Sequence, residues 1–150
     1  METRQLGGTG VEVTRIALGC GNFGGVGSAP AFFGQGETRD EAFAVMDAAW
    51  DLGIRLFDTA ASYGGGRSER WIGEWMASRG RSPVVETKVF HSVVGDPDDH
   101  GLAPDRIRRE LAGSLERRVR VGRMDEVQLD VIEPQPLQRA GELAPDPARS

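Results

Sequence analysis

Hydrophobic and polar positions along the chain predict three strand–helix units followed by a fourth strand. Short apolar or alternating runs predict strands over residues 15–19, 54–57, 84–89 and 127–131. Between these runs, apolar residues at helical spacing predict three helices. The first begins after Thr38, which forms a capping box with Glu41; Ser68 is expected to cap the second, and Pro104 to lie in the first turn of the third.

The two ends of the chain differ from this repeating pattern. Residues 4–13, RQLGGTGVEV, predict a small β-hairpin around a Gly-Gly-Thr-Gly turn. Residues 133–150 contain four of the eight prolines and little apolar periodicity, so we expect a mostly unstructured tail.

Burial can also be predicted for two of the inner elements. We expect residues 15–19 to form a buried strand. The third helix should present an apolar stripe, made of Ile107, Leu111, Leu115 and Val119.

Alternation of strands and helices indicates an α/β fold with a parallel sheet. The pattern alone leaves an open doubly wound sheet and a (β/α) barrel as alternatives. At 150 residues, the chain has room for one domain of ordinary size.

Composition narrows the classes of function. The net charge of −5 argues against a nucleic-acid-binding protein, which is usually basic. No apolar run approaches the roughly 20 residues of a membrane-spanning helix, and the N-terminus lacks the apolar segment of a signal peptide. Cys20 is the single cysteine, so we expect no intramolecular disulfide and a cytoplasmic location.

The segment RIALGCGNFGG contains Gly19, Gly21 and Gly24 in the spacing G-x-G-x-x-G, which is typical of dinucleotide-binding turns. Such a turn requires a helix that begins at the third glycine and an acidic residue about 20 positions later. Here more glycine and proline follow, and the acid that ends the second strand is Asp58, 37 residues after Gly21. The sequence therefore argues against a Rossmann dehydrogenase or methyltransferase.

Three polar residues follow successive predicted strands. Asp58 ends the second strand, Tyr63 lies in the loop after it, and Lys88 lies near the end of the third. Tyr63 is the only tyrosine of the chain and Lys88 is its only lysine. The chain has 18 lysine and arginine residues in total, so all the others are arginine. Carboxyl ends of parallel strands meet at one edge, where barrel enzymes build their active sites. The joint placement favours a site, although each residue alone could be structural.

These residues lie in segments that resemble the aldo-keto reductase family. DTAASYGGGRSERWIGEWM resembles the family signature after strand two, and VVETKV the strand that carries the family's lysine. RQLGGTGVEVTRIALG and APDRIRRELAGSLERR resemble its N-terminal hairpin and third helix. The resemblance implies the N-terminal half of a (β/α)8 TIM barrel, about four βα units after a small hairpin, with residues 1–132 as the partial barrel.

The resemblance also implies a reaction. Family members reduce aldehydes and ketones with NADPH, less often NADH, so a small carbonyl compound would be the substrate. Tyr63 would protonate the carbonyl oxygen, Lys88 would favour the phenolate, and Asp58 would pair with Lys88. The loop at Cys20 and Gly21, together with Asp58, would contact the cofactor; no metal, nucleic acid or membrane is implied.

Two features depart from the family pattern. The family's catalytic histidine at the end of strand four is missing from MDEVQLDVIEPQPLQ; His91 and His100 lie in the loop after the third strand. A complete barrel takes about 250 residues, so the chain from Arg118 onward is expected to be truncated or frame-shifted. The chain could therefore be a non-catalytic half-barrel fragment or interaction module, and two half barrels could self-associate.

Overall fold

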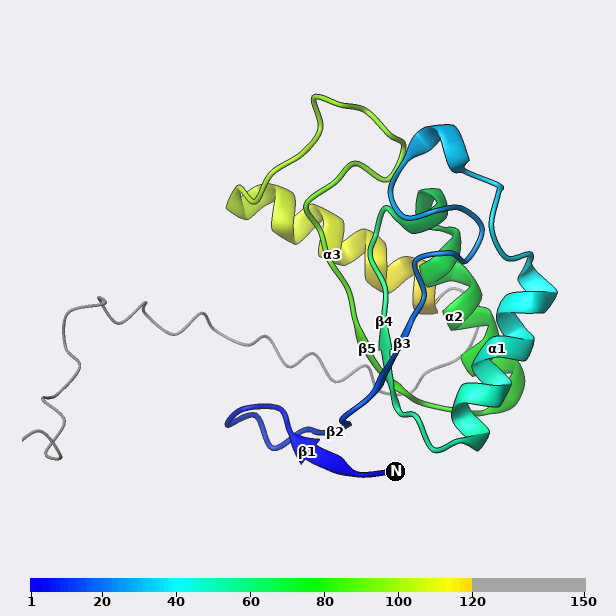
Figure 1. The fold of residues 1–150 in the computed structure, drawn as a ribbon. Helices are drawn as coiled ribbons and strands as arrows, with labels where there is room; N and C mark the ends of the chain where they lie inside the picture. The colour runs from blue at the N-terminus through cyan, green and yellow to red at the C-terminus, as the bar shows by residue number, and fades with distance from the viewer. Residues whose placement is uncertain (120–150) are drawn as a thin grey trace, which may run out of the picture.

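The computed structural model describes residues 1–119, and within them a three-stranded parallel sheet forms the centre of the fold (Figure 1). The strand order is β3-β4-β5, with bounds Ala17–Gly19, Leu56–Asp58 and Val84–Glu86. Strands are thus found where they were predicted, but each is only three residues long. The predicted strand at 127–131 and the tail at 133–150 lie outside the described residues.

Helices follow each strand and lie together along the sheet (Figure 1). Their bounds are Arg39–Asp51 for α1, Arg67–Arg79 for α2 and Pro104–Val119 for α3. Helix α2 packs against both α1 and α3. The predicted hairpin is confirmed as an antiparallel pair of β1, Thr3–Gln5, and β2, Glu12–Thr14. None of the described helices is long and apolar enough to cross a membrane.

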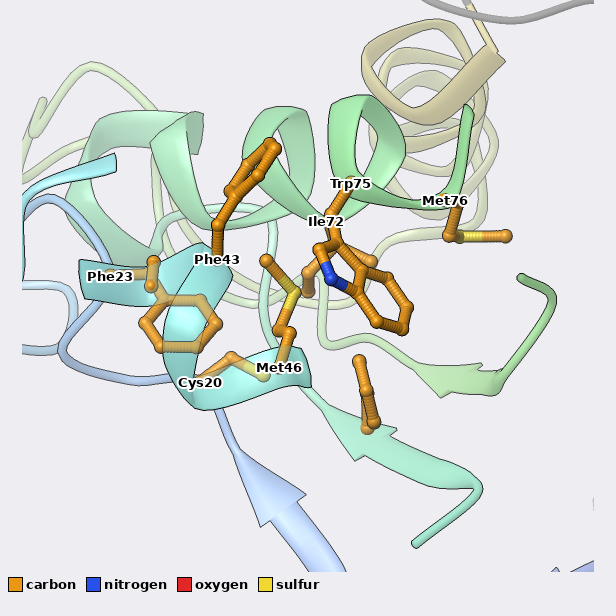
Figure 2. Packing of buried hydrophobic residues seen from close by; sticks show 9 residues of the cluster. Cys20, Phe23, Phe43, Met46, Ile72, Trp75 and Met76 are labelled. Atoms are coloured by element: carbon orange, nitrogen blue, oxygen red, sulfur yellow. The ribbon is translucent and has the colours of Figure 1, made fainter. Parts of the chain in front are cut away.

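The hydrophobic core lies between the sheet and helices α1 and α2 (Figure 2). Phe57 of the central strand and Trp75 of α2 are fully buried, with ring centres 5.4 Å apart. Side chains alternate along a strand, so Phe57 points to the helices while its neighbours Leu56 and Asp58 belong to the other face of the sheet. Leu56 and Asp58 are only half-buried. This second face is where polar chemistry can reach solvent.

Residues 15–19, which include β3, were expected to form a buried strand, and this prediction was wrong. Ala17 and Gly19 of β3 are exposed, as is Ile16 just before them. The physical reason is that β3 is an edge of the sheet in the described part of the chain, and the face to which Ala17 belongs has no layer against it.

Local capping signals predicted one helix start correctly and another incorrectly. Thr38 caps α1 in the expected box: its backbone N–H donates to the Glu41 carboxylate at 2.8 Å, and its side chain accepts from the Glu41 N–H. Ser68 does not cap α2. That helix begins at Arg67 after Gly66, whose φ of +81° favours glycine, and Ser68 is buried in the first turn.

Helix α3 buries a polar face rather than the predicted apolar stripe. Arg106 and Ser114 are buried, whereas Ile107 of the stripe is exposed and Leu111 is half-buried. Pro104 is the first helical residue, as predicted. Contacts between α3 and α2 are therefore partly polar. Among the described residues, the apolar stripe is only partly buried.

Candidate active site

The structure brings Asp58, Tyr63 and Lys88 together at the carboxyl edge of the sheet. Asp58 is the last residue of β4, Lys88 lies two residues beyond β5, and Tyr63 begins the short 3₁₀ helix η2, Tyr63–Gly66. The ammonium Nζ of Lys88 donates to Oδ1 of Asp58, and to the carbonyl of Thr59 at 2.9 Å. The same Nζ lies 5.2 Å from the centre of the Tyr63 ring.

Parallel pairing explains why Asp58 and Lys88 meet. Asp58 is in register with Glu86, and the pairing continues past both strands: Thr59 N donates to the Glu86 carbonyl at 2.9 Å, and Ala61 N to the Lys88 carbonyl at 3.0 Å. Lys88 is two residues past Glu86, so its side chain belongs to the same face of the sheet as Asp58. The ion pair thus follows directly from the register.

Lys88 remains cationic across the neutral range. Partial burial by itself lowers the pKa of Lys88, but the hydrogen bond that its ammonium donates to Asp58 and the proximity of Tyr63 outweigh burial and raise the pKa above its ordinary value of 10.5. The lysine side chain is 44% exposed and that of Asp58 38%. The site therefore holds a fixed positive charge beside a phenol, within reach of solvent.

Glycines let the loop after β3 lie against the turn that carries Tyr63. A Cβ on Gly25 would lie 2.7 Å from the Gly64 Cα, and a Cβ on Gly64 would lie 2.5 Å from the Phe23 carbonyl oxygen. Gly64 also has a φ of +58°, which side-chain-bearing residues rarely adopt. Gly25 and Gly64 therefore allow the loop after β3 and the turn at Tyr63 to contact each other directly. No α-helix begins at Gly24, which confirms that the motif is not a Rossmann turn.

Cys20 and Gly21 play different parts in this loop. Cys20 is fully buried in the core, where burial and the nearby Asp58 raise the pKa of its thiol to about 12 (Figure 2). Its backbone N–H donates to the Asp58 carbonyl at 2.9 Å. Gly21 is half-buried, and a Cβ there would touch Tyr63 Cε2 at 3.8 Å. A cofactor contact from this loop would therefore involve Gly21, since the Cys20 side chain faces the core.

The edge beside Asp58 presents bare backbone, which suits a flat ring. Gly19 is in register with Asp58, is exposed, and has open space where a Cβ would lie. Gly21 lies beside the Tyr63 ring, whose centre is 5.2 Å from the Lys88 ammonium. No group of three metal-ligating side chains occurs in the described residues.

Sequence reasoning missed the residues behind this site. Ser68 Oγ donates to the Cys20 carbonyl at 2.9 Å, and the Glu69 carboxylate accepts from Thr87 Oγ1 at 2.7 Å. Glu69 is fully buried and pairs with Arg117 of α3 at 2.7 Å. A signal was present, because Glu69 lies at helical spacing on the same side of α2 as Ile72, where an unpaired charge would be costly.

The two histidines pack elsewhere in the loop after β5. The rings of His91 and His100 lie 5.0 and 5.7 Å from Phe90, and His100 Nδ1 is 2.7 Å from the Pro97 carbonyl oxygen. Residues 124–138, where the resemblance implies a catalytic histidine, contain none and lie outside the described residues. The described site therefore consists of Asp58, Tyr63 and Lys88.

Comparison with known proteins shows the family of this chain. The family model described as "Aldo/keto reductase family" matches residues 15–137. The chain belongs to the aldo/keto reductase family. It is 40% identical over 131 residues to an uncharacterized oxidoreductase, YrpG, of Bacillus subtilis, covering 78% of this chain and 36% of that protein. It is 37% identical over 103 residues to pyridoxal 4-dehydrogenase of Microbacterium luteolum, covering 69% and 28%.

Solved aldo-keto reductases show the same fold. The described structure superposes on a putative aldo-keto reductase from Pseudomonas aeruginosa with a TM-score of 0.62 and 32% identity, covering 77% of this chain and 42% of that one. The chain spans about a third of the length of the curated relatives named above. Its α/β fold is therefore that of the N-terminal part of an aldo/keto reductase TIM barrel, with three βα units described.

Proposed function

We propose that this chain takes part in the NAD(P)H-dependent reduction of an aldehyde or ketone to an alcohol. The observation that carries the proposal is Lys88, whose ammonium bonds to Asp58 and lies beside the ring of Tyr63. NADPH is the cofactor that we propose first, with NADH as the alternative. We place the reaction in the cytoplasm, where a single buried thiol such as that of Cys20 stays reduced.

Each residue has a distinct part in this reaction. The nicotinamide supplies the hydride that adds to the carbonyl carbon. Tyr63 donates its hydroxyl proton to the carbonyl oxygen, and water returns a proton to the phenolate. The Lys88 cation stabilises the negative charge that forms on Tyr63, because opposite charges a few ångströms apart attract. Asp58 holds the lysine side chain in place through its bond to Nζ.

Cofactor binding is tested first, with the purified 150-residue chain. Titration with NADPH, followed by nicotinamide fluorescence, should give saturable binding that the Lys88→Met variant loses. The decrease in absorbance at 340 nm, as NADPH is oxidised in the presence of an aromatic aldehyde, then measures turnover. Tyr63→Phe should bind NADPH normally but react about 10²–10⁴-fold more slowly, since it lacks the proton donor. A Tyr63→Phe rate equal to that of the original chain would contradict the proposed acid.

A second candidate function, a non-catalytic interaction module, is favoured by the face of the sheet that residues 1–119 leave uncovered. Ala17, Leu56 and Val84 are in register on that face, and none of them is buried. We propose that a second copy of the chain covers this face. An absence of NADPH binding together with self-association would support this candidate over the reductase.

A further inference from the structure

The first turn of α2 lies behind the site and contacts all three strand ends that build it. Two neighbouring residues make these contacts, Ser68 and Glu69, and both are fully buried. Neither has a part in the proton and hydride transfer proposed above. Their hydrogen bonds run to the residues that directly precede or follow Gly21, Asp58 and Lys88 in the sequence.

Ser68 joins the ends of the first two strands of the sheet. Its Oγ lies 2.8 Å from Thr59 Oγ1, and Thr59 directly follows Asp58. The same Oγ donates to the carbonyl of Cys20 at 2.9 Å, and Cys20 directly precedes Gly21. Because the Ser68 hydroxyl is buried, water does not compete for these hydrogen bonds.

Glu69 holds the end of the third strand. Its Oε1 accepts from Thr87 Oγ1 at 2.7 Å, and Thr87 directly precedes Lys88. Its Oε2 pairs with Nε of Arg117 at 2.7 Å, so α3 neutralises the buried charge. A buried carboxylate is costly unless it is paired and hydrogen-bonded, and both oxygens of Glu69 have such partners. Glu69 therefore links β5, α2 and α3 at one point.

The Asp58–Lys88 pair needs such support, because it is half-exposed. An ion pair that is open to solvent is weak, so the bond from Nζ to Asp58 keeps the lysine side chain in place only if the backbone that carries it is also held. The position of Nζ then depends on how firmly the backbone at Lys88 is held. The Ala61 N–H holds the Lys88 carbonyl at 3.0 Å, and the Thr87 hydroxyl provides the anchor on the opposite face of the strand.

We propose that Ser68 and Glu69 are positioning residues, which hold Asp58 and Lys88 in the geometry that the proposed reaction uses. The importance of that geometry rests on the proposed function, but the positioning itself can be measured without turnover. Lys88 is the only lysine of the chain, so ¹³C-lysine labelling gives one side-chain NMR signal whose titration reports on its contacts with Asp58 and Tyr63.

The experiment compares Thr87→Val with Thr87→Ser in the full 150-residue chain. Thr87→Val keeps the shape but removes the hydroxyl that Glu69 accepts from, whereas Thr87→Ser keeps the hydroxyl. We expect the pKa of Lys88 to fall in Thr87→Val, toward its ordinary value of 10.5, and to stay unchanged in Thr87→Ser. A merely structural role would lower the melting temperature without moving this pKa.

A Lys88 pKa in Thr87→Val equal to that of the original chain would overturn the proposal, whether or not the protein reduces carbonyls. Near-UV circular dichroism of the three tryptophans checks that each variant is folded. If Thr87→Val does not fold, Ser68→Ala replaces it, because this change removes the bonds to Thr59 and Cys20. The same fall in the pKa of Lys88 supports the proposal, and an unchanged value overturns it.

Discussion

The ammonium of Lys88 lies 5.2 Å from the centre of the Tyr63 ring, and these two residues are the only lysine and the only tyrosine of the chain. They come from different strand–loop junctions, 25 positions apart in the sequence. Asp58, at a third position, bonds to the same ammonium. The proposed proton donation by Tyr63 uses this cation beside the phenol. Because the chain has one lysine and one tyrosine, spectroscopy can observe each group directly.

Removal of Asp58 should lower the pKa of Lys88. Asp58→Asn removes the negative charge that raises this pKa and leaves only a neutral acceptor for the Lys88 ammonium, while the opposing effect of partial burial remains. We expect a fall toward the ordinary value of 10.5, and a modest one because the pair is half-exposed. Titration of the single ¹³C-lysine signal measures it. Asp40→Asn, on the exposed side of α1, is the matched control and should leave the pKa of Lys88 unchanged.

The thiol of Cys20 should be unreactive in the folded chain. Only the thiolate reacts with disulfide reagents, and burial raises the pKa of Cys20 to about 12. At pH 8 we expect labelling by a chromogenic disulfide to be about 100-fold or more slower in the native chain than in urea. Equal rates in both conditions would show that the loop at Cys20 is open to solvent.

The same thiol should make the chain less stable at high pH. The folded pKa lies above the ordinary value of 9.0, so the stabilising contribution of the neutral thiol is complete below pH 9 and is lost as the pH rises toward about 12. Urea unfolding at pH 8, 9.5 and 11 measures this loss. The Lys88 ammonium also loses its proton at high pH, so the difference between the original chain and Cys20→Ala isolates the thiol, and parallel curves would contradict the assignment.

The meeting of Asp58, Tyr63 and Lys88 could be predicted from the sequence because these residues follow local rules. Asp58 and Lys88 lie at or near the end of an apolar run, Tyr63 lies in the loop after Asp58, and the carboxyl ends of parallel strands meet at one edge. The Thr38–Glu41 box was equally accessible, since both partners lie within one helical turn.

The support behind the site was not accessible in this way. Glu69 and Arg117 are 48 positions apart, so no local pattern links them. A buried serine in a first helical turn looks like a cap in the sequence, whereas Ser68 bonds to Thr59 and to the Cys20 carbonyl. For α3, periodicity locates apolar positions such as Ile107 but does not say which neighbour the helix meets. In the described residues it meets α2 through polar groups.

Gly64→Ala should destabilise the fold by about 3 kcal/mol or more, because it combines an unfavourable φ with a steric clash. The φ is +58°, and the new Cβ would lie 2.5 Å from the Phe23 carbonyl oxygen. Gly27→Ala is the matched control: its φ is +57°, but nothing lies within 4 Å of the new Cβ. That change should cost only about 1–2 kcal/mol. Urea unfolding measures both, and equal costs would mean that the loops are not in close contact.

The uncovered sheet face leads to a prediction about oligomeric state. Parallel sheets are normally covered on both faces, whereas Ala17, Leu56 and Val84 have no layer against them in the described residues. We therefore expect sedimentation at tens of micromolar to give a species of twice the chain mass. Val84→Glu should shift it to the monomer, since a charge would be buried at the contact.

Val45→Glu is the control for this change, because Val45 is an exposed valine on α1, away from the uncovered face. It should leave the association unchanged. Loss of the dimer in both variants would point to charge repulsion rather than to a specific contact. A monomer at every concentration of the original chain would mean that a second copy does not cover the sheet, and the half-exposed Leu56 and Val84 would then need another partner to account for their position.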